Sequence, residues 1–192
     1  MTQDSVINND VRWARATLRF CPPYLTTILN NSKLSEPLVE ESKMENKYKL
    51  RKSLGKGEGI FATKPFKTGE IVIIGIIEKV LDKNDSHASQ IGEHKFIRHA
   101  GLIPKINHSC EPNCGIRINK TGAHDIIAMK DIAVGEEITI DYAMRNYTID
   151  YFPNKCRCGS EKCRGTITGW KYLPKEIREE YHGFVAPYLL KL

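Results

Sequence analysis

The amino-acid sequence predicts a mainly β fold of the α+β class. Residues 48–52 and 59–63 have the composition of short strands, and the glycines between them provide a turn. Residues 70–80 are rich in isoleucine and valine, so we expect a buried pair of strands there. Because many short strands with glycine turns are accompanied by few helical patterns, the chain is assigned to the α+β class.

Residues 1–47 are predicted to form an N-terminal segment and linker. The first ten residues are predicted to be disordered, and residues 11–30 carry apolar side chains at helical spacing. Pro22 and Pro23 interrupt this stretch, so it is predicted to form two short helical pieces. The residues that follow are polar and charged, as is typical of a linker.

Residues 48–144 are predicted to form the main domain. Gly75 is expected to mark a bulge or a bend within the isoleucine-rich stretch, and the polar residues 82–101 are expected to form an insert of mixed structure. The remaining elements follow in order: a hairpin of residues 115–119 and 124–129 around Lys120-Thr121-Gly122, a turn at 131–136 and a strand at 137–140.

Residues 145–192 are predicted to form a C-terminal segment with three closely spaced cysteines and a final helix. The helix is expected to begin at Pro174, because proline suits the first helical position and the acidic residues after it suit the first turn. Gly183 is expected to end it, since glycine readily adopts the left-handed conformation found at helix ends.

The composition suits one compact intracellular domain. The chain has 192 residues, 41% of them hydrophobic, and a net charge of +6, which is compatible with an acidic partner without identifying one. It lacks runs of about 18 apolar residues that could cross a membrane. Its first ten residues also lack the basic and apolar parts of a signal peptide. We therefore expect a cytoplasmic protein without a membrane partner, with secretion into a host nucleus left open.

Three sequence blocks carry the functional prediction. They read Lys105-Ile-Asn-His-Ser-Cys-Glu-Pro-Asn-Cys114, then Gly135-Glu-Glu-Ile-Thr-Ile-Asp-Tyr142, then Cys156-Arg-Cys158-Gly-Ser-Glu-Lys-Cys163. In this order, and preceded by Gly55-Lys-Gly57-Glu-Gly59, they resemble the SET-domain protein-lysine methyltransferases. The resemblance extends from about residue 48 to 165. It implies a SET fold of small curved sheets with a pseudoknot at the active site, followed by a zinc-bound post-SET segment.

The resemblance also implies a site for S-adenosylmethionine. Gly57, Glu58 and Gly59 alone would indicate an ordinary tight turn, and the sequence that follows does not match a phosphate-binding loop. By resemblance, this turn lies against the methionine part of the cofactor. Asn107 then binds the methionine moiety, and the backbone of His108 meets the adenine.

Tyr142 occupies the position of the family's catalytic tyrosine. Methyl transfer to lysine needs a neutral, desolvated and aligned amine, so the site chiefly orients that amine and accepts its hydrogen bonds. By resemblance, the Tyr142 hydroxyl holds the amine or lies against the methyl group, so Tyr142 counts among both the catalytic and the cofactor-binding residues. An isolated tyrosine at the end of a strand would otherwise be structural.

The cysteines predict a structural zinc ion. Clustered cysteines in a reducing compartment more often bind a metal than form disulfides. The family binds zinc with the three cysteines of the last block and the cysteine of Asn-His-Ser-Cys, which implies Cys110, Cys156, Cys158 and Cys163 as the tetrahedral ligands. Cys114 competes for the fourth position, and Cys21 is expected to be a buried apolar residue.

The sequence departs from the family at Ile140, where an aromatic residue is usual. Ile140 is assigned with Tyr142 to the substrate channel, and its lack of a hydroxyl predicts that two or three methyl groups can be added, unless Tyr147, Tyr151 or Phe152 fills the space.

Other polar residues are given ordinary roles. Glu136 and Glu137 are not read as a hydrolytic pair, because neighbouring strand residues point to opposite faces. The insert histidines His87, His94 and His99 are read as polar or packing residues, with the first two alternatively lining a substrate cleft.

Two functions follow from the sequence. The favoured one is S-adenosylmethionine-dependent methyl transfer to a lysine of a protein or peptide, with nucleic acid not expected as substrate. The alternative is a catalytically silent, zinc-stapled SET-like module that binds a peptide or nucleic acid. Retention of Asn107, His108 and Tyr142 together favours the enzyme. The substrate protein and the oligomeric state are left open.

Overall fold

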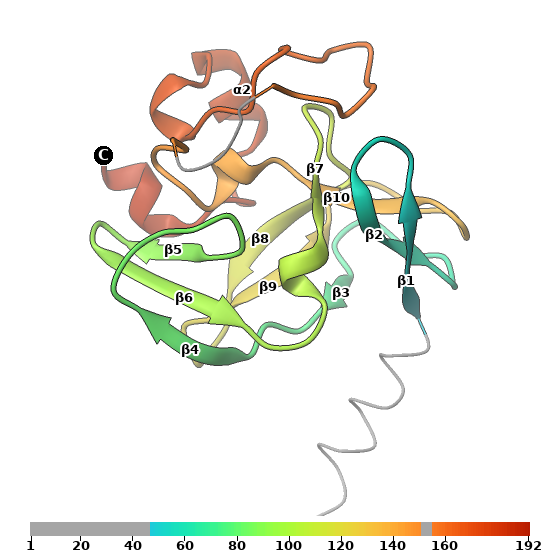
Figure 1. Ribbon diagram of the computed structural model, residues 1–192, viewed down its shortest axis with the longest axis horizontal. Helices are drawn as coiled ribbons and strands as arrows, with labels where there is room; N and C mark the ends of the chain where they lie inside the picture. The colour runs from blue at the N-terminus through green and yellow to red at the C-terminus, as the bar shows by residue number, and fades with distance from the viewer. Residues whose placement is uncertain (1–46, 151–154) are drawn as a thin grey trace, which may run out of the picture. The chain divides into compact units, whose positions relative to one another are not determined.

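The computed structural model describes residues 47–150 and 155–192 of the chain (Figure 1). The predicted helical pieces at 11–30, Cys21, Tyr151 and Phe152 lie outside the described residues. The boundaries of the three predicted segments stay a prediction.

Ten short strands form three small sheets in the described part of the chain (Figure 1). The four-stranded sheet has the order β1 (Tyr48–Ser53), β2 (Gly57–Ala62), β10 (Glu137–Ile140) and β7 (Asn107–His108). The second sheet consists of β3 (Ile71–Ile73), β9 (His124–Ala128) and β8 (Cys114–Ile118), and the third of β4 (Ile77–Leu81), β6 (Lys95–His99) and β5 (Ser89–Gly92). Strands with few and short helices confirm the predicted mainly β class.

The isoleucine-rich stretch forms strands of two different sheets, so the expected buried strand pair was wrong. β3 pairs with β9, whereas β4 pairs with β6 and leaves Val80 72% exposed. The chain changes sheets at Gly75, where a Cβ atom would lie 2.3 Å from the carbonyl oxygen of His124. Only glycine allows this close approach, and the bend that it permits separates β3 from β4.

The pairing of β7 with β10 places the first two functional blocks side by side. This pairing is parallel, whereas the other strand pairs of the described chain are antiparallel. Thr139 lies opposite Asn107, and Ile140 lies opposite His108. The Asn-His dipeptide therefore meets the strand that ends two residues before Tyr142, across about thirty residues of sequence.

The C-terminal elements pack against a core shared by the sheets. They are η3 (Trp170–Tyr172), α2 (Lys175–Glu180) and η4 (Pro187–Lys191), while η1 (Ile103–Lys105) and η2 (Tyr142–Met144) flank β7 and β10. Pro174 is the residue before α2 rather than its first residue, and Gly183 follows the helix with a φ of 86°. In the described parts of the chain no helix is long and apolar enough to cross a membrane.

The predicted insert contributes a small antiparallel sheet with a buried histidine. His99, in β6, accepts a hydrogen bond at Nε2 from the backbone N–H of His124 (3.1 Å). Its other ring nitrogen lies 3.2 Å from the hydroxyl of Ser89. A neutral ring with its proton on Nδ1 satisfies both contacts. The His124 ring is also buried, with its centroid 5.5 Å from that of His99, and neither of its ring nitrogens has a protein hydrogen-bond partner.

These two histidines are expected to make the protein less stable at acidic pH. Burial, with the nearby charge of Arg145, lowers the pKa of His99 to about 4, and burial lowers the pKa of His124 well below its ordinary value. Between about pH 6.5 and 4 the unfolded chain therefore binds protons that the folded chain does not. The free energy of unfolding should fall over this range by up to about 1.4 kcal/mol per pH unit for each histidine.

Urea unfolding of His124→Leu at several pH values tests this expectation. The slope of stability against pH should be shallower than in the wild type, because one of the two sites is gone. His94→Gln is the matched control, since the side chain of His94 is 90% exposed. Equal slopes in the wild type and His124→Leu would contradict the assignment.

Candidate active site and cysteine cluster

Tyr142 begins η2, directly after β10, and its side chain points back to β7. Its hydroxyl donates a hydrogen bond to the carbonyl oxygen of Ile106 (3.0 Å), and its ring meets the ring of His108 edge-on at 5.3 Å. Asp141 caps η2 by accepting a hydrogen bond from the N–H of Ala143 (3.0 Å). These contacts fix both the backbone and the ring of Tyr142.

Asn107 joins the glycine turn to β10. Its side-chain nitrogen donates to the carbonyl oxygen of Glu58 (2.9 Å) and to the carboxylate of Glu137 (2.7 Å). Both amide protons are therefore used within the protein, and the side-chain oxygen remains as an acceptor for a ligand. A Cβ atom at Gly59 would lie 2.3 Å from the Glu137 carboxylate and 2.7 Å from the Asn107 nitrogen, which explains the glycine at this position.

Two ion pairs border the glycine turn. Lys56 lies 2.6 Å from Glu137, and Lys105 lies 3.0 Å from Glu58. Burial alone would raise the pKa of Glu137, but hydrogen bonds from Lys56, Asn107 and Ser53 outweigh it and hold that pKa below its ordinary value. Glu136, which lies just before β10, instead accepts a hydrogen bond from Asn113, so the adjacent carboxylates have different partners.

Two pockets meet at Tyr142. The larger has a volume of about 250 Å³ and is lined by Lys56, Glu58, Ser86, His87, Pro104, Lys105, Ile106, Asn107 and Tyr142. The smaller has a volume of about 180 Å³ and is lined by Gly55, Lys56, Asn107, His108, Tyr142, Lys155, Arg157, Cys158 and Ile167. Lys56, Asn107 and Tyr142 line both. The glycine-turn residue Glu58, the Asn-His dipeptide and Tyr142 therefore lie around one divided cavity.

Some residues singled out in the sequence lie elsewhere. Ile140, expected in the substrate channel, is fully buried in the core and lines neither pocket. His87 lines the larger pocket, whereas His94 is exposed and His99 is buried within the third sheet. Gly57 and Gly59 lie in β2 on either side of Glu58, which lines the larger pocket, and they line neither pocket themselves.

A buried network ties the C-terminal segment to the residue before Tyr142. The carboxylate of Asp141 is fully buried and lies 2.5 Å from Nη2 of Arg164. It also accepts a hydrogen bond from the Tyr181 hydroxyl (3.2 Å), which lies 3.5 Å from the Cys110 carbonyl oxygen. Sequence reasoning missed Arg164 and Tyr181, because their partners are distant in the sequence.

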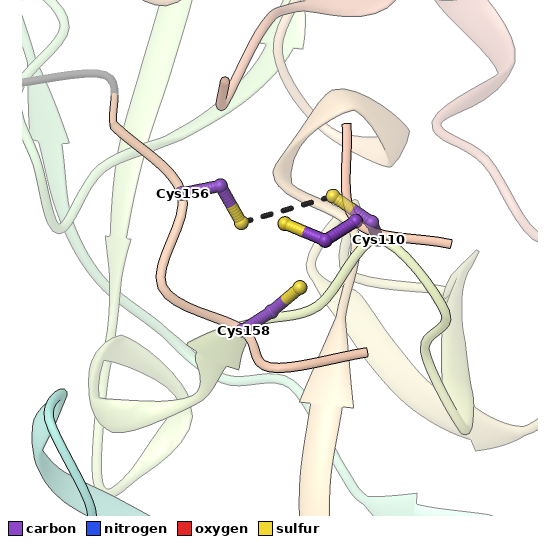
Figure 2. Close-up of side chains that lie close together, drawn as sticks. Cys110, Cys156 and Cys158 are labelled. Carbon is purple, nitrogen blue, oxygen red and sulfur yellow. Dashed lines mark hydrogen bonds between the residues drawn. The ribbon is translucent and has the colours of Figure 1, made fainter. Parts of the chain in front are cut away.

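Four cysteine sulfurs lie within 4.8 Å of one another: those of Cys110, Cys156, Cys158 and Cys163. Figure 2 shows the first three converging on one point, and the sulfurs of Cys110 and Cys156 are 3.7 Å apart. Zn–S bonds of about 2.3 Å in a tetrahedron place sulfurs about 3.8 Å apart, so the cluster fits a zinc ion. Cys114 lies in β8 within the core and is outside the cluster.

The surroundings of the sulfurs also suit thiolates. The backbone N–H groups of Arg164 and Gly165 donate to the sulfurs of Cys110 and Cys163, each at 3.4 Å. Burial raises the pKa of the Cys110 thiol to about 11, although the hydrogen bond from the Arg164 N–H and the nearby guanidinium of Arg164 lower it. A divalent cation among the sulfurs would offset this cost of ionisation.

Comparison with known proteins identifies the family. Residues 57–143 match the family model described as the SET domain. The chain is 33% identical over 149 residues to the histone-lysine N-methyltransferase ATX2 of Arabidopsis thaliana, an alignment that covers 65% of this chain and 14% of that protein. It is 32% identical over 165 residues to the "Probable histone-lysine N-methyltransferase set-23" of Caenorhabditis briggsae, covering 72% of this chain and 65% of that protein.

Solved structures show the same fold. KRYPTONITE, solved in complex with mCHG DNA and SAH, matches with a TM-score of 0.52 at 23% identity, over 62% of this chain and 28% of that one. The methyltransferase domain of human SETMAR matches with a TM-score of 0.50 at 21% identity, over 64% of this chain and 58% of that one. The fold and site thus define a SET-type domain. The chain belongs to the SET-domain family, and it spans only part of the length of these relatives.

Proposed function

We propose that this chain transfers a methyl group from S-adenosylmethionine to the side chain of a lysine in a protein. The observation that carries the proposal is the position of Tyr142. Tyr142 lines both pockets, and its hydroxyl donates a hydrogen bond to the carbonyl oxygen of Ile106. A polar side chain shared by two pockets suits a reaction in which two substrates meet from different sides.

The pocket residues offer the groups that the cofactor requires. An amino-acid zwitterion needs an acceptor for its ammonium group and a cation for its carboxylate. The side-chain oxygen of Asn107 supplies the first, and Lys56, which lines the same smaller pocket and is paired with Glu137, supplies the second. His108 lines the smaller pocket, where its backbone is proposed to meet the adenine. When bound, S-adenosylmethionine supplies the electrophilic methyl group.

The protein's own task is to present a neutral amine. A lysine side chain has a pKa near 10.4, so removing its proton at pH 7 costs about 4–5 kcal/mol. The Tyr142 hydroxyl donates its proton to Ile106, and the lone pairs of its oxygen are the proposed acceptor for a hydrogen bond from the amine. Tyr142 thereby orients the nitrogen lone pair toward the methyl donor.

The relatives direct the choice of substrate. ATX2 and the nematode protein are described as histone-lysine N-methyltransferases, so histone tails are the first substrates to test. The substrate protein itself, the cytoplasmic location and the addition of two or three methyl groups stay predictions.

Methyl transfer from a labelled donor to histones and to a lysine-peptide library tests the proposal. We expect label on lysine, and the mass of the product peptide counts the methyl groups. Calorimetry with S-adenosylmethionine separates the alternatives. Binding without transfer to any substrate would favour the silent binding module, and absence of binding would refute a cofactor site.

Replacing Asn107 by alanine is expected to weaken cofactor binding. The substitution removes the proposed acceptor for the ammonium group and the two hydrogen bonds that hold the glycine turn. A loss of about 1–3 kcal/mol corresponds to roughly 5- to 150-fold in the dissociation constant. Calorimetry measures this change, and the affinity of Asn119→Ala, which alters an amide of the β8–β9 hairpin, should stay at the wild-type value. Wild-type affinity in Asn107→Ala would contradict the assignment.

A further inference from the structure

Arg145 is a buried cation that contacts the proposed catalytic residue. It follows η2 directly and is only 3% exposed. The central carbon of its guanidinium lies 4.9 Å from the centroid of the Tyr142 ring, within the range of cation–π interactions. The ring of Tyr142 is therefore enclosed by the His108 ring and by this guanidinium.

The charge of Arg145 has no acidic partner among the described residues. Its Nη1 donates a hydrogen bond to the Ser89 hydroxyl (3.1 Å), and its buried Nε has no partner in the protein. No aspartate or glutamate of the described chain forms an ion pair with it. A buried, unpaired cation is costly for stability, so its presence beside Tyr142 calls for another explanation.

The other charges near Tyr142 are balanced or solvated. Lys56 is paired with Glu137, and Asp141 is paired with Arg164. The remaining ionisable groups against Tyr142 or Arg145 are His108, His99 and His124. Those of the pocket walls are Glu58 with Lys105, His87, Lys155, Arg157 and Cys158, the last of which belongs to the cysteine cluster. Burial lowers the pKa of His99 and His124, which keeps them neutral near pH 7. The backbone N–H of Tyr142 donates to Nδ1 of His108 (3.3 Å), so this nitrogen carries no proton. Lys155 and Arg157 are exposed to solvent, which screens them. The buried charge facing Tyr142 is thus that of Arg145.

We propose that Arg145 is a positioning residue for Tyr142 and that its unpaired charge favours the neutral form of the target amine. This inference rests on the proposed methyltransferase function. A cation beside the tyrosine makes it unfavourable to place a protonated ammonium group at the hydroxyl, whereas a neutral amine carries no such cost. The flat guanidinium also holds the tyrosine ring in one orientation.

The third sheet holds Arg145 in place. Ser89, in β5, accepts the hydrogen bond from Nη1, and the next residue, Gln90, accepts one from the backbone N–H of Tyr147 (3.1 Å). In addition, Asn84 approaches the side chain of Asn146 (3.4 Å). Residues of the insert 82–101 thereby hold Arg145, Asn146 and Tyr147 in place, and Arg145 in turn holds the ring of Tyr142.

The pH dependence of kcat/KM for a lysine peptide tests the charge. In Arg145→Met, which keeps a long apolar stem without charge, the pH at which kcat/KM levels off should rise by about half a unit to one unit. The rate should then be roughly three- to tenfold lower at pH 7.5 and should recover toward the plateau at high pH. Arg145→Lys keeps the charge, so its midpoint should stay at the wild-type pH while kcat falls, because an ammonium group cannot stack flat on the ring.

Ligand binding gives a readout independent of turnover. S-adenosylmethionine carries a sulfonium charge that S-adenosylhomocysteine lacks. Removal of the Arg145 charge should therefore shift the ratio of their affinities toward S-adenosylmethionine, measured by calorimetry on wild type and Arg145→Met. Ser89→Ala keeps the charge and loosens its anchor, so it should leave the affinity ratio and the midpoint unchanged while lowering kcat modestly.

The outcomes separate this inference from the proposed function. Two results would overturn the electrostatic role. One is an equal loss of kcat/KM at every pH in Arg145→Met. The other is a shift of the kcat/KM midpoint in Arg145→Lys that is as large as the shift in Arg145→Met. If Arg145→Met does not fold, Arg145→Gln and the lysine variant carry the same comparison. A wild type that binds both ligands and methylates nothing would refute the proposed function, whereas an active wild type with an unchanged Arg145→Met profile refutes only the role of Arg145.

Discussion

Tyr142→Phe should lower kcat for methyl transfer by at least about a hundredfold while leaving cofactor affinity nearly unchanged. The hydroxyl is the only group removed, and it is the group proposed to accept a hydrogen bond from the target amine. Phenylalanine keeps the ring contacts with His108 and Arg145, so the walls of both pockets should persist. Single-turnover assays with saturating cofactor, together with calorimetry, separate the two effects.

The stability of this variant is the necessary control. The Ile106 carbonyl loses its donor, which should cost about 1 kcal/mol in the free energy of unfolding. Tyr172→Phe serves as the matched variant, because Tyr172 is 61% exposed and lines neither pocket, and its kcat should match the wild type. A wild-type rate in Tyr142→Phe would show that the tyrosine is only structural.

The sequence predicted the strands better than their partners. Glycine turns and β-branched residues located β1, β2 and the β8–β9 hairpin to within a few residues. Periodicity could not predict the two-residue strand β7, whose existence depends on parallel pairing with β10. The error at residues 70–80 has a similar cause: isoleucine and valine indicate a strand, but the exposure of β4 is set by the bend at Gly75 and by the sheet that it joins.

In the candidate site, too, residues in local motifs were predicted, whereas residues that matter through tertiary contacts were missed. Short local motifs led to Asn107, Tyr142 and the four cysteines, which the fold brings near one another. Arg145 and Arg164 were missed because their significance is burial beside Tyr142 and Asp141, which no local pattern encodes. Arg164 directly follows Cys163, and this position was the available signal in the sequence. A charged residue in a loop is usually exposed to solvent, so the sequence alone did not predict its burial.

Removal of the metal is expected to abolish activity, because the cysteine cluster supports a wall of the smaller pocket. We expect about one zinc per chain, held by Cys110, Cys156, Cys158 and Cys163. Lys155, Arg157, Cys158 and Ile167 line that pocket, and Arg164 from the same segment pairs with Asp141. Without the ion, three of the four ligands lose their link to Cys110, so both this wall and the support behind Tyr142 should loosen.

Chelation and Cys158→Ser should therefore lower zinc content, cofactor affinity and methyl transfer together. Elemental analysis, calorimetry and the transfer assay on one preparation measure the three quantities. Cys114→Ala is the matched control: its sulfur lies in the core outside the cluster, so zinc content should stay at one per chain even if the lost side chain costs some stability. Because the Arg164–Asp141 pair depends on the position of this segment, a metal-free protein with full activity would show that the pair alone holds the wall, and the cluster would then have no part in the site.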